Sequence, residues 1–155
     1  MNAFRVAAVF VCSVSGLEHF TESSQIKEIA NDSDVWVVEH HHPGCGTCTE
    51  FSPIFKQLAS ERSDVKFAAL SIEHKSIQDF AGQNGILDEG VPNLRILHTI
   101  GDSVGSMVVP IGIETSHIPK NFKETCTKAI DRVLVKHGLE QNEGLYQKGE
   151  YEEEL

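Results

Sequence analysis

The sequence is poor in cysteine, in basic residues and in long apolar runs. Its 155 residues include four cysteines, too few for a small domain held together by disulfides. Lysine and arginine number 13 against 23 aspartates and glutamates, which gives a formal net charge of −10. A nucleic-acid-binding protein needs a basic face, so this balance argues against a nucleic acid as partner. The apolar run at residues 6–14 is too short to cross a bilayer as a helix, so we expect no membrane span in the mature protein.

The N-terminus has the pattern of a secretory signal peptide at residues 1–16. One positive charge within the first five residues precedes the apolar run 6–14, and small residues then offer a cleavage site. Cleavage there would also remove Cys12. A valine-rich run of this length can instead be a buried first strand. If residues 1–16 are retained in the mature protein, a cytoplasmic location becomes the better interpretation.

The C-terminus, residues 140–155, has few apolar side chains and several acids, so we expect an acidic, disordered tail. Its last four residues are Glu152-Glu153-Glu154-Leu155, and the final two match the Lys-Asp-Glu-Leu retention signal. Glu152 replaces the basic first residue of that signal, so a plain solvated tail is the alternative. Together the two termini favour the lumen of the endoplasmic reticulum or secretion.

Residues 17–139 are expected to form one domain, because the hydrophobic periodicity alternates between helices and strands. Continuous β-branched runs predict strands that are buried on both faces, as in a parallel sheet under helices. The strands are predicted near residues 35–38, 65–72, 94–98 and 108–109, and the helices near residues 23–30, 45–60, 77–81 and 119–137. The last two strands should form a hairpin, and Pro110 suggests that the second lies at a sheet edge. This order predicts an α/β fold with a central mixed sheet flanked by helices.

Among the cysteines, only Cys45 and Cys48 are closely spaced, and they fall where a predicted strand gives way to a helix. Unpaired N–H groups and the partial positive charge of a helix N-terminus both lower the pKa of a thiol at Cys45. A Cys45 thiolate can attack a disulfide, and Cys48 can then resolve the mixed disulfide. The same spacing can form half of a zinc site, but the second close pair is missing, so we expect neither a metal nor a cofactor. Cys126 lies on the inward stripe of the last predicted helix and should be a buried, inert thiol, with a regulatory thiol as the alternative.

Three histidines, His40, His41 and His42, precede the cysteine pair. On an extended segment His40 and His42 point to one side and His41 to the other. Two interpretations stay open. They are exposed loop residues without a role, or a protonated His42 lies near Cys45 and stabilises its thiolate.

Several other residues lie at sequence separations from the cysteines that are typical of one protein family. Glu39 precedes Cys45 by six residues, and Pro53 follows Cys48 by five, inside the predicted helix, which it should bend. Pro43 and the pair Val91-Pro92 complete the set. With these residues the chain resembles the thioredoxin superfamily and, more narrowly, the catalytic (a-type) domains of protein disulfide isomerases. The resemblance covers roughly residues 17–138.

This resemblance implies a role for each matching residue. Glu39 would transfer a proton to and from Cys48, and burial in a valine-rich strand should raise the pKa of its carboxyl group. A structural acid paired to a lysine is the alternative. Pro92 would follow a cis peptide bond and leave the backbone of Val91 free to pair with an extended substrate. From composition alone, Val91-Pro92 could be a plain loop.

The chain departs from that family at several positions. Gly44 replaces a tryptophan that offers an apolar substrate platform, and Thr47 replaces a histidine that makes the disulfide more oxidising. Ile113, after Gly112, replaces an arginine that is thought to ease reoxidation. The stretch 85–91 is about two residues longer than usual. We therefore expect a less oxidising pair than in a typical isomerase.

The sequence predicts a thiol–disulfide oxidoreductase or isomerase that acts on protein or peptide thiols and disulfides and aids folding in the secretory pathway. Its catalytic residues would be Cys45, Cys48 and Glu39, and its substrate contacts would be Gly44, Thr47, Val91 and Pro92. One alternative is a cytosolic thioredoxin-like reductant. The other is a binding or chaperone module with weak or no redox activity.

Overall fold

The computed structural model describes residues 16–29, 32–100, 103–112, 118–136, 139–142 and 145–148. Its main sheet has five strands in the order β1-β3-β2-β4-β5. They span Leu17–Phe20 (β1), Trp36–His41 (β2), Lys66–Ser71 (β3), Asn93–Ile100 (β4) and Ser103–Val108 (β5). β3 pairs in parallel with β1 and β2, whereas β4 pairs antiparallel with β2 and β5. The predicted mixed sheet is confirmed, and β5 lies at its edge as predicted.

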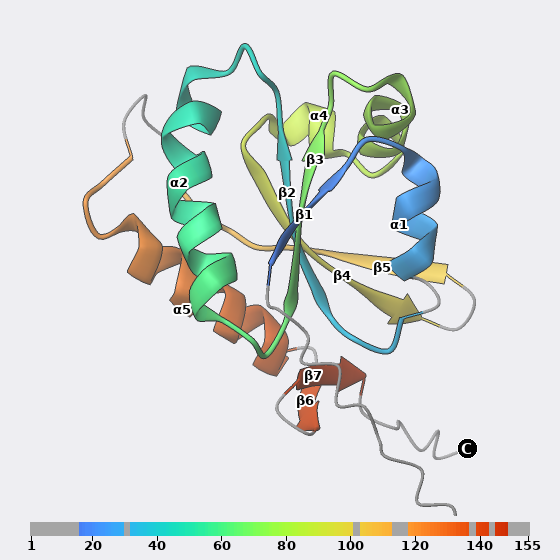
Figure 1. Ribbon diagram of the computed structural model, residues 1–155, viewed down its shortest axis with the longest axis vertical. Helices are drawn as coiled ribbons and strands as arrows, with labels where there is room; N and C mark the ends of the chain where they lie inside the picture. Colours follow the sequence, from blue (N-terminus) through green and yellow to red (C-terminus); the bar gives the residue numbers. More distant parts are fainter. Residues whose placement is uncertain are drawn as a thin grey trace, which may run out of the picture.

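Helices cover both faces of this sheet, as Figure 1 shows. On one face lie α2 (Gly46–Glu61) and α5 (Phe122–Lys136), and on the other lie α1 (Ser23–Ile29) and α3 (Lys75–Gln83). The short helix α4 (Ile86–Glu89) connects α3 to β4. None of the described helices is both long and apolar enough to cross a membrane.

Two separate cores hold the helices to the sheet. Under α2 and α5, residues such as Val37, Phe55 and Ile130 are fully buried in one cluster. On the other face, Trp36 and Val38 belong to a second cluster with residues of α1 and α3. Successive residues of β2 thus enter opposite cores, as the alternation of a strand requires. The sheet is buried on both faces at its centre, which explains the continuous apolar run in this part of the sequence.

Four described elements differ from the sequence expectation. β1 was not predicted, because only its first and last residues, Leu17 and Phe20, contact the cores. α4 was not predicted because it has only four residues. A hairpin of β6 (Leu139–Asn142) and β7 (Leu145–Lys148) occupies the start of the interval assigned to a disordered tail. Its first residue, Leu139, is buried in the core beneath α5. This contact holds the hairpin against the domain, although the segment after it has few apolar side chains.

Several expectations concern residues that the structure does not describe. The signal peptide falls on residues 1–16, of which only Gly16 is described, and the retention signal falls on residues 152–155. Ile113 is also outside the described residues. These three expectations remain predictions.

The packing of α2 can be tested at Phe55. Its ring is fully buried and lies 5.8 Å from that of Phe51 and 5.5 Å from that of Phe67, between centroids. Because Phe55→Ala leaves a cavity, we expect it to lower the free energy of unfolding by about 3–5 kcal/mol in urea titrations. Val135→Ala is the control, since Val135 on α5 is 73% exposed. Equal losses in the two variants would contradict this account of the core.

Candidate active site

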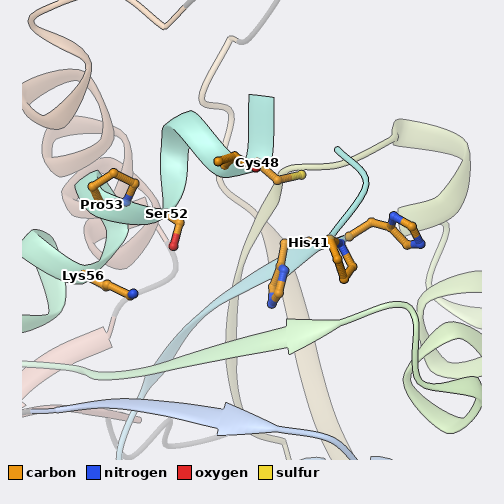
Figure 2. Close-up of a pocket in the computed structure, with 8 residues that line it drawn as sticks. His41, Cys48, Ser52, Pro53 and Lys56 are labelled. Carbon is orange, nitrogen blue, oxygen red and sulfur yellow. The ribbon is translucent and has the colours of Figure 1, made fainter. Parts of the chain in front are cut away.

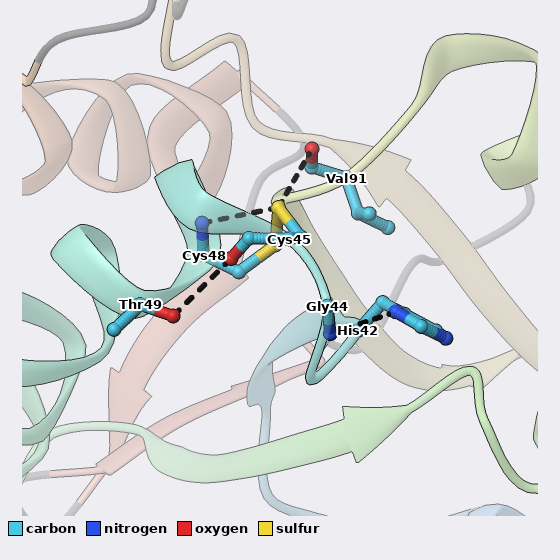
Figure 3. Close-up of a disulfide and its surroundings, with 6 residues drawn as sticks. All are labelled: His42, Gly44, Cys45, Cys48, Thr49 and Val91. Carbon is cyan, nitrogen blue, oxygen red and sulfur yellow. Dashed lines mark hydrogen bonds between the residues drawn. A yellow bond between two sulfur atoms is a disulfide. The ribbon is translucent and has the colours of Figure 1, made fainter.

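The two predicted redox cysteines form a disulfide at the start of α2 (Figure 3). Their Cα atoms are 5.2 Å apart. Cys45 is the N-cap residue of α2, with extended backbone angles, and its amide donates to the carbonyl oxygen of His42 over 3.0 Å. The amide of Cys48 lies 3.1 Å from Cys45 Sγ and donates to it. An N–H group of the first helical turn thus points at this sulfur, where it would also stabilise a thiolate.

The two sulfurs differ in their access to solvent. Cys45 is half-buried, whereas Cys48 is 4% exposed. A substrate can therefore approach Cys45, while Cys48 is shielded by the protein. This asymmetry suits an attacking thiol and a resolving thiol, as the sequence analysis assigned them.

The loop before β4 closes over the other side of Cys45. The peptide bond between Val91 and Pro92 is cis, as predicted. The carbonyl oxygen of Val91 lies 3.6 Å from Cys45 Sγ (Figure 3). Gly90, just before it, has a φ of 85°, which side chains other than glycine rarely adopt. The structure therefore brings Val91 and Pro92 next to the disulfide.

Glu39 is a buried acid on β2, 3% exposed, on the same side of the strand as Val37. Burial raises the pKa of its carboxyl group from 4.5 to about 7, and the positive charge of Lys56 on α2 partly opposes this rise. The predicted rise is confirmed. Its Oε1 atom has no hydrogen-bond partner within the described residues.

A pocket of about 310 Å³ opens beside the buried cysteine (Figure 2). Its lining includes Cys48, Ser52 and Lys56, one turn apart along α2, together with His41 at the end of β2. Lys56 is also the charge that acts on Glu39. The sequence analysis missed Ser52 and Lys56, although their spacing of four residues from Cys48 places them on one helix face.

The three histidines have three different environments. His40 is fully buried and stacks on Phe80 with 6.2 Å between ring centroids, so its interpretation as an exposed loop residue is wrong. Burial, with the charge of Arg95 as the next cause, lowers its pKa to about 3. His41 is half-buried, and burial, then the charge of His19, lowers its pKa. Both rings therefore favour the neutral form.

His42 is exposed, and its side chain forms a hydrogen bond within the loop that contains it. Its Nδ1 accepts a hydrogen bond of 3.0 Å from the amide of Gly44, and Figure 3 shows its ring pointing away from the disulfide. The hypothesis that His42 stabilises the thiolate of Cys45 is therefore not supported by this geometry. A Cβ atom at position 44 would lie 3.2 Å from His42 Nδ1, so the glycine permits this close contact.

Two remaining expectations concern other residues that could bind or react. Cys126 is fully buried in α5, and burial raises the pKa of its thiol to about 12, so it is the inert thiol that was predicted. Over the ranges that the structure describes, histidines, cysteines and acids nowhere gather in a group of three that could hold a metal ion. Thr47 lies between the two cysteines and is half-buried.

A disulfide at a helix N-terminus beside a cis-proline loop is the arrangement that the resemblance to the thioredoxin superfamily implied. The sequence model of the Thioredoxin family matches residues 16–110, and the chain belongs to this family. Its fold is the thioredoxin fold. The narrower resemblance to the a-type domains of protein disulfide isomerases agrees with the names of the relatives to which this sequence is similar.

Three known proteins illustrate this relationship. The chain is 32% identical over 97 residues to the protein disulfide-isomerase A6 homolog of Drosophila melanogaster, and 30% identical over 100 residues to human protein disulfide-isomerase A6. The matches cover 61% and 59% of this chain but only 22% of each relative. Among solved structures, the Trx4 domain of ERdj5 has a TM-score of 0.58 at 18% identity, covering 78% of this chain and 97% of that domain. This last likeness concerns the fold alone.

The buried acid gives the stability a defined pH dependence. Because its pKa rises from 4.5 to about 7 on folding, the folded protein binds this proton more tightly than the unfolded chain. Stability from this group is thus present below pH 4.5 and is lost as the pH rises towards 7. We expect Glu39→Gln to be more stable than the wild type at pH 8, by up to about 3 kcal/mol relative to the same comparison at pH 4.

Urea titrations of the oxidised proteins at both pH values would measure this difference. Glu61→Gln is the control, because Lys123 lowers the pKa of Glu61, and this variant should gain nothing at pH 8. If Glu39→Gln differs from the wild type equally at pH 4 and pH 8, the carboxyl group does not titrate as described.

Proposed function

We propose that this domain catalyses thiol–disulfide exchange on proteins or peptides, as an isomerase or reductase that assists folding in the secretory pathway. The observation that carries the proposal is the pairing of a half-exposed Cys45 with a buried Cys48 at the start of α2. The acid that such chemistry requires is present, because Glu39 is buried near the same helix with a pKa of about 7.

In the reducing direction, the thiolate of Cys45 attacks one sulfur of a substrate disulfide. A bond forms between Cys45 and that sulfur, the substrate disulfide breaks, and the second substrate sulfur leaves as a thiolate. Cys48 then attacks Cys45 Sγ and releases the first substrate sulfur. The substrate gains two electrons, and the domain is left with the Cys45–Cys48 disulfide. An external thiol must return these electrons before the next cycle.

The second step needs Cys48 to lose a proton inside the protein. Glu39 is the proposed acceptor, and with a pKa of about 7 it is available in both the charged and the neutral form near neutral pH. In the oxidising direction the neutral carboxyl group returns the proton to the departing Cys48. The pocket lined by Cys48 and Lys56 supports this assignment, because Lys56 also acts on Glu39.

The substrate is proposed to bind as an extended chain along the backbone of Val91, whose carbonyl oxygen lies beside Cys45 Sγ. Pro92, Gly44 and Thr47 would border it. The secretory location is supported by the signal-like residues 1–16 and by relatives named protein disulfide-isomerase A6. Those relatives are much longer than this chain, so their substrates and redox partners are not transferred to it.

Equilibration of the protein lacking residues 1–16 in graded glutathione buffers tests this proposal. After alkylation of free thiols, mass analysis gives the fraction of molecules with the Cys45–Cys48 disulfide. We expect a two-electron transition between about −180 and −230 mV, on the more reducing side because Thr47 carries no charge. A transition near about −270 mV would favour the cytosolic reductant instead. A protein that forms no disulfide at any poise would leave only the binding module.

Trapping tests the assignment of the two cysteines. We expect reduced Cys48→Ser to accumulate a mixed disulfide with a peptide that contains one disulfide, because the resolving thiol is missing. Cys45→Ser should accumulate none, since Cys48 is 4% exposed. Mass analysis of the acid-quenched mixtures gives both yields. Equal trapping by the two variants would contradict the assigned roles.

A further inference from the structure

Three side chains form a closed ring of hydrogen bonds beneath the cis-proline loop. Arg95 Nε donates to Asn93 Oδ1 over 3.0 Å, and Asn93 Nδ2 donates to Glu89 Oε2 over 2.8 Å. The same Glu89 oxygen lies 2.8 Å from a terminal nitrogen of Arg95. The ring joins the last residue of α4 to the start of β4.

Arg95 is the charged residue of this ring that is buried, and Asn93 is buried beside it. The side chain of Arg95 is 6% exposed, against 41% for that of Glu89. A terminal nitrogen of its guanidinium also lies 3.4 Å from the carbonyl oxygen of Asn84, at the end of α3. A buried guanidinium without its acid would be an uncompensated charge, so the position of Glu89 is tightly linked to that of Arg95.

The ring encloses a short stretch of chain. Only Gly90, Val91 and Pro92 separate Glu89 from Asn93. At one end, the amide of Gly90 donates to the carbonyl oxygen of Ile86 over 3.0 Å. The middle residue, Val91, places its carbonyl oxygen 3.6 Å from Cys45 Sγ. The two ends of the segment that faces the disulfide are thus tied to each other and to the buried Arg95.

We infer that Glu89, Asn93 and Arg95 are positioning residues, which hold the backbone of Val91 where an extended peptide disulfide must pair with it. This inference rests on the proposed function, because it names what fixes the substrate-binding strand of that site. The positioning role also predicts that two classes of substrate respond differently when the ring is broken. A peptide needs the Val91 backbone, whereas a small dithiol reacts with the disulfide without pairing to it.

Glu89→Gln tests the inference, since it keeps the shape of the side chain and removes the charge that Arg95 requires. Glu61→Gln is a matched control on α2. Glu61 also accepts from a cation, Lys123, and from an amide, Gln57, and its side chain is 48% exposed. The two acids are similarly exposed and each variant loses one ion pair, but only Glu89 pairs with a buried cation and adjoins the loop.

Turnover of a fluorogenic peptide with one internal disulfide, regenerated by reduced glutathione, gives KM and kcat for each protein. We expect Glu89→Gln to raise KM about tenfold, because a factor of this size corresponds to the loss of one hydrogen bond to a charged group. The value of kcat should change less than about twofold. The rate at which dithiothreitol reduces the Cys45–Cys48 disulfide should be unaltered. Glu61→Gln should match the wild type in all three quantities.

An unchanged KM in Glu89→Gln would overturn the inference. An equal fall in the peptide and dithiothreitol rates would also overturn it, because that result indicates a general distortion. If Glu89→Gln does not fold, Asn93→Ala replaces it. That variant opens the ring but leaves the pair of Glu89 and Arg95, and the same rise in KM is expected.

A wild-type protein without exchange activity would refute the proposed function rather than the ring. The ring is then tested by backbone ¹⁵N relaxation at Gly90 and Val91. Greater motion at these two residues in Glu89→Gln than in Glu61→Gln would support the positioning role. Identical relaxation in the two variants would overturn it.

Discussion

Strand β2 runs through the middle of the sheet, with β3 on one side and β4 on the other, and helices cover both of its faces (Figure 1). Its first five residues are all buried. A polar side chain on this strand is therefore removed from water whichever way it points, and its charged form is disfavoured. The strand also ends just before the loop that carries Cys45. The position of β2 thus decides both where the disulfide lies and which protonation states are available near it.

Two neighbouring residues of β2 show different outcomes of this constraint. Glu39 points to the face covered by α2, where Lys56 partly offsets its burial and its pKa falls near 7. It can exchange a proton at neutral pH. His40 points to the opposite face, against Phe80, where burial and Arg95 keep it neutral. One step along the strand therefore separates an acid with a pKa near 7 from a neutral histidine that packs against Phe80.

Much of this arrangement could be predicted from the sequence, because it depends on local patterns. The β-branched run around Val37 predicted a buried central strand, and the apolar stripe of α5 predicted a helix packed on the sheet. The spacing of Glu39 from Cys45 indicated which acid is buried in that strand. The histidines could not be placed, because whether a histidine is buried depends on Phe80 and Arg95, which lie far along the chain. The helix α4 was missed for a similar reason. It has four residues, and contacts rather than periodicity define it.

Under the proposed function, the residues next to the disulfide leave the binding of a substrate mainly to the backbone. Gly44 offers no aromatic platform, and its lack of a Cβ lets His42 hold the loop from within. Thr47 offers no charge. What remains beside Cys45 is the carbonyl group of Val91, and a backbone group binds only as well as it is positioned. The ion pair of Glu89, the last residue of α4, with the buried Arg95 ties the loop that carries this carbonyl group to β4.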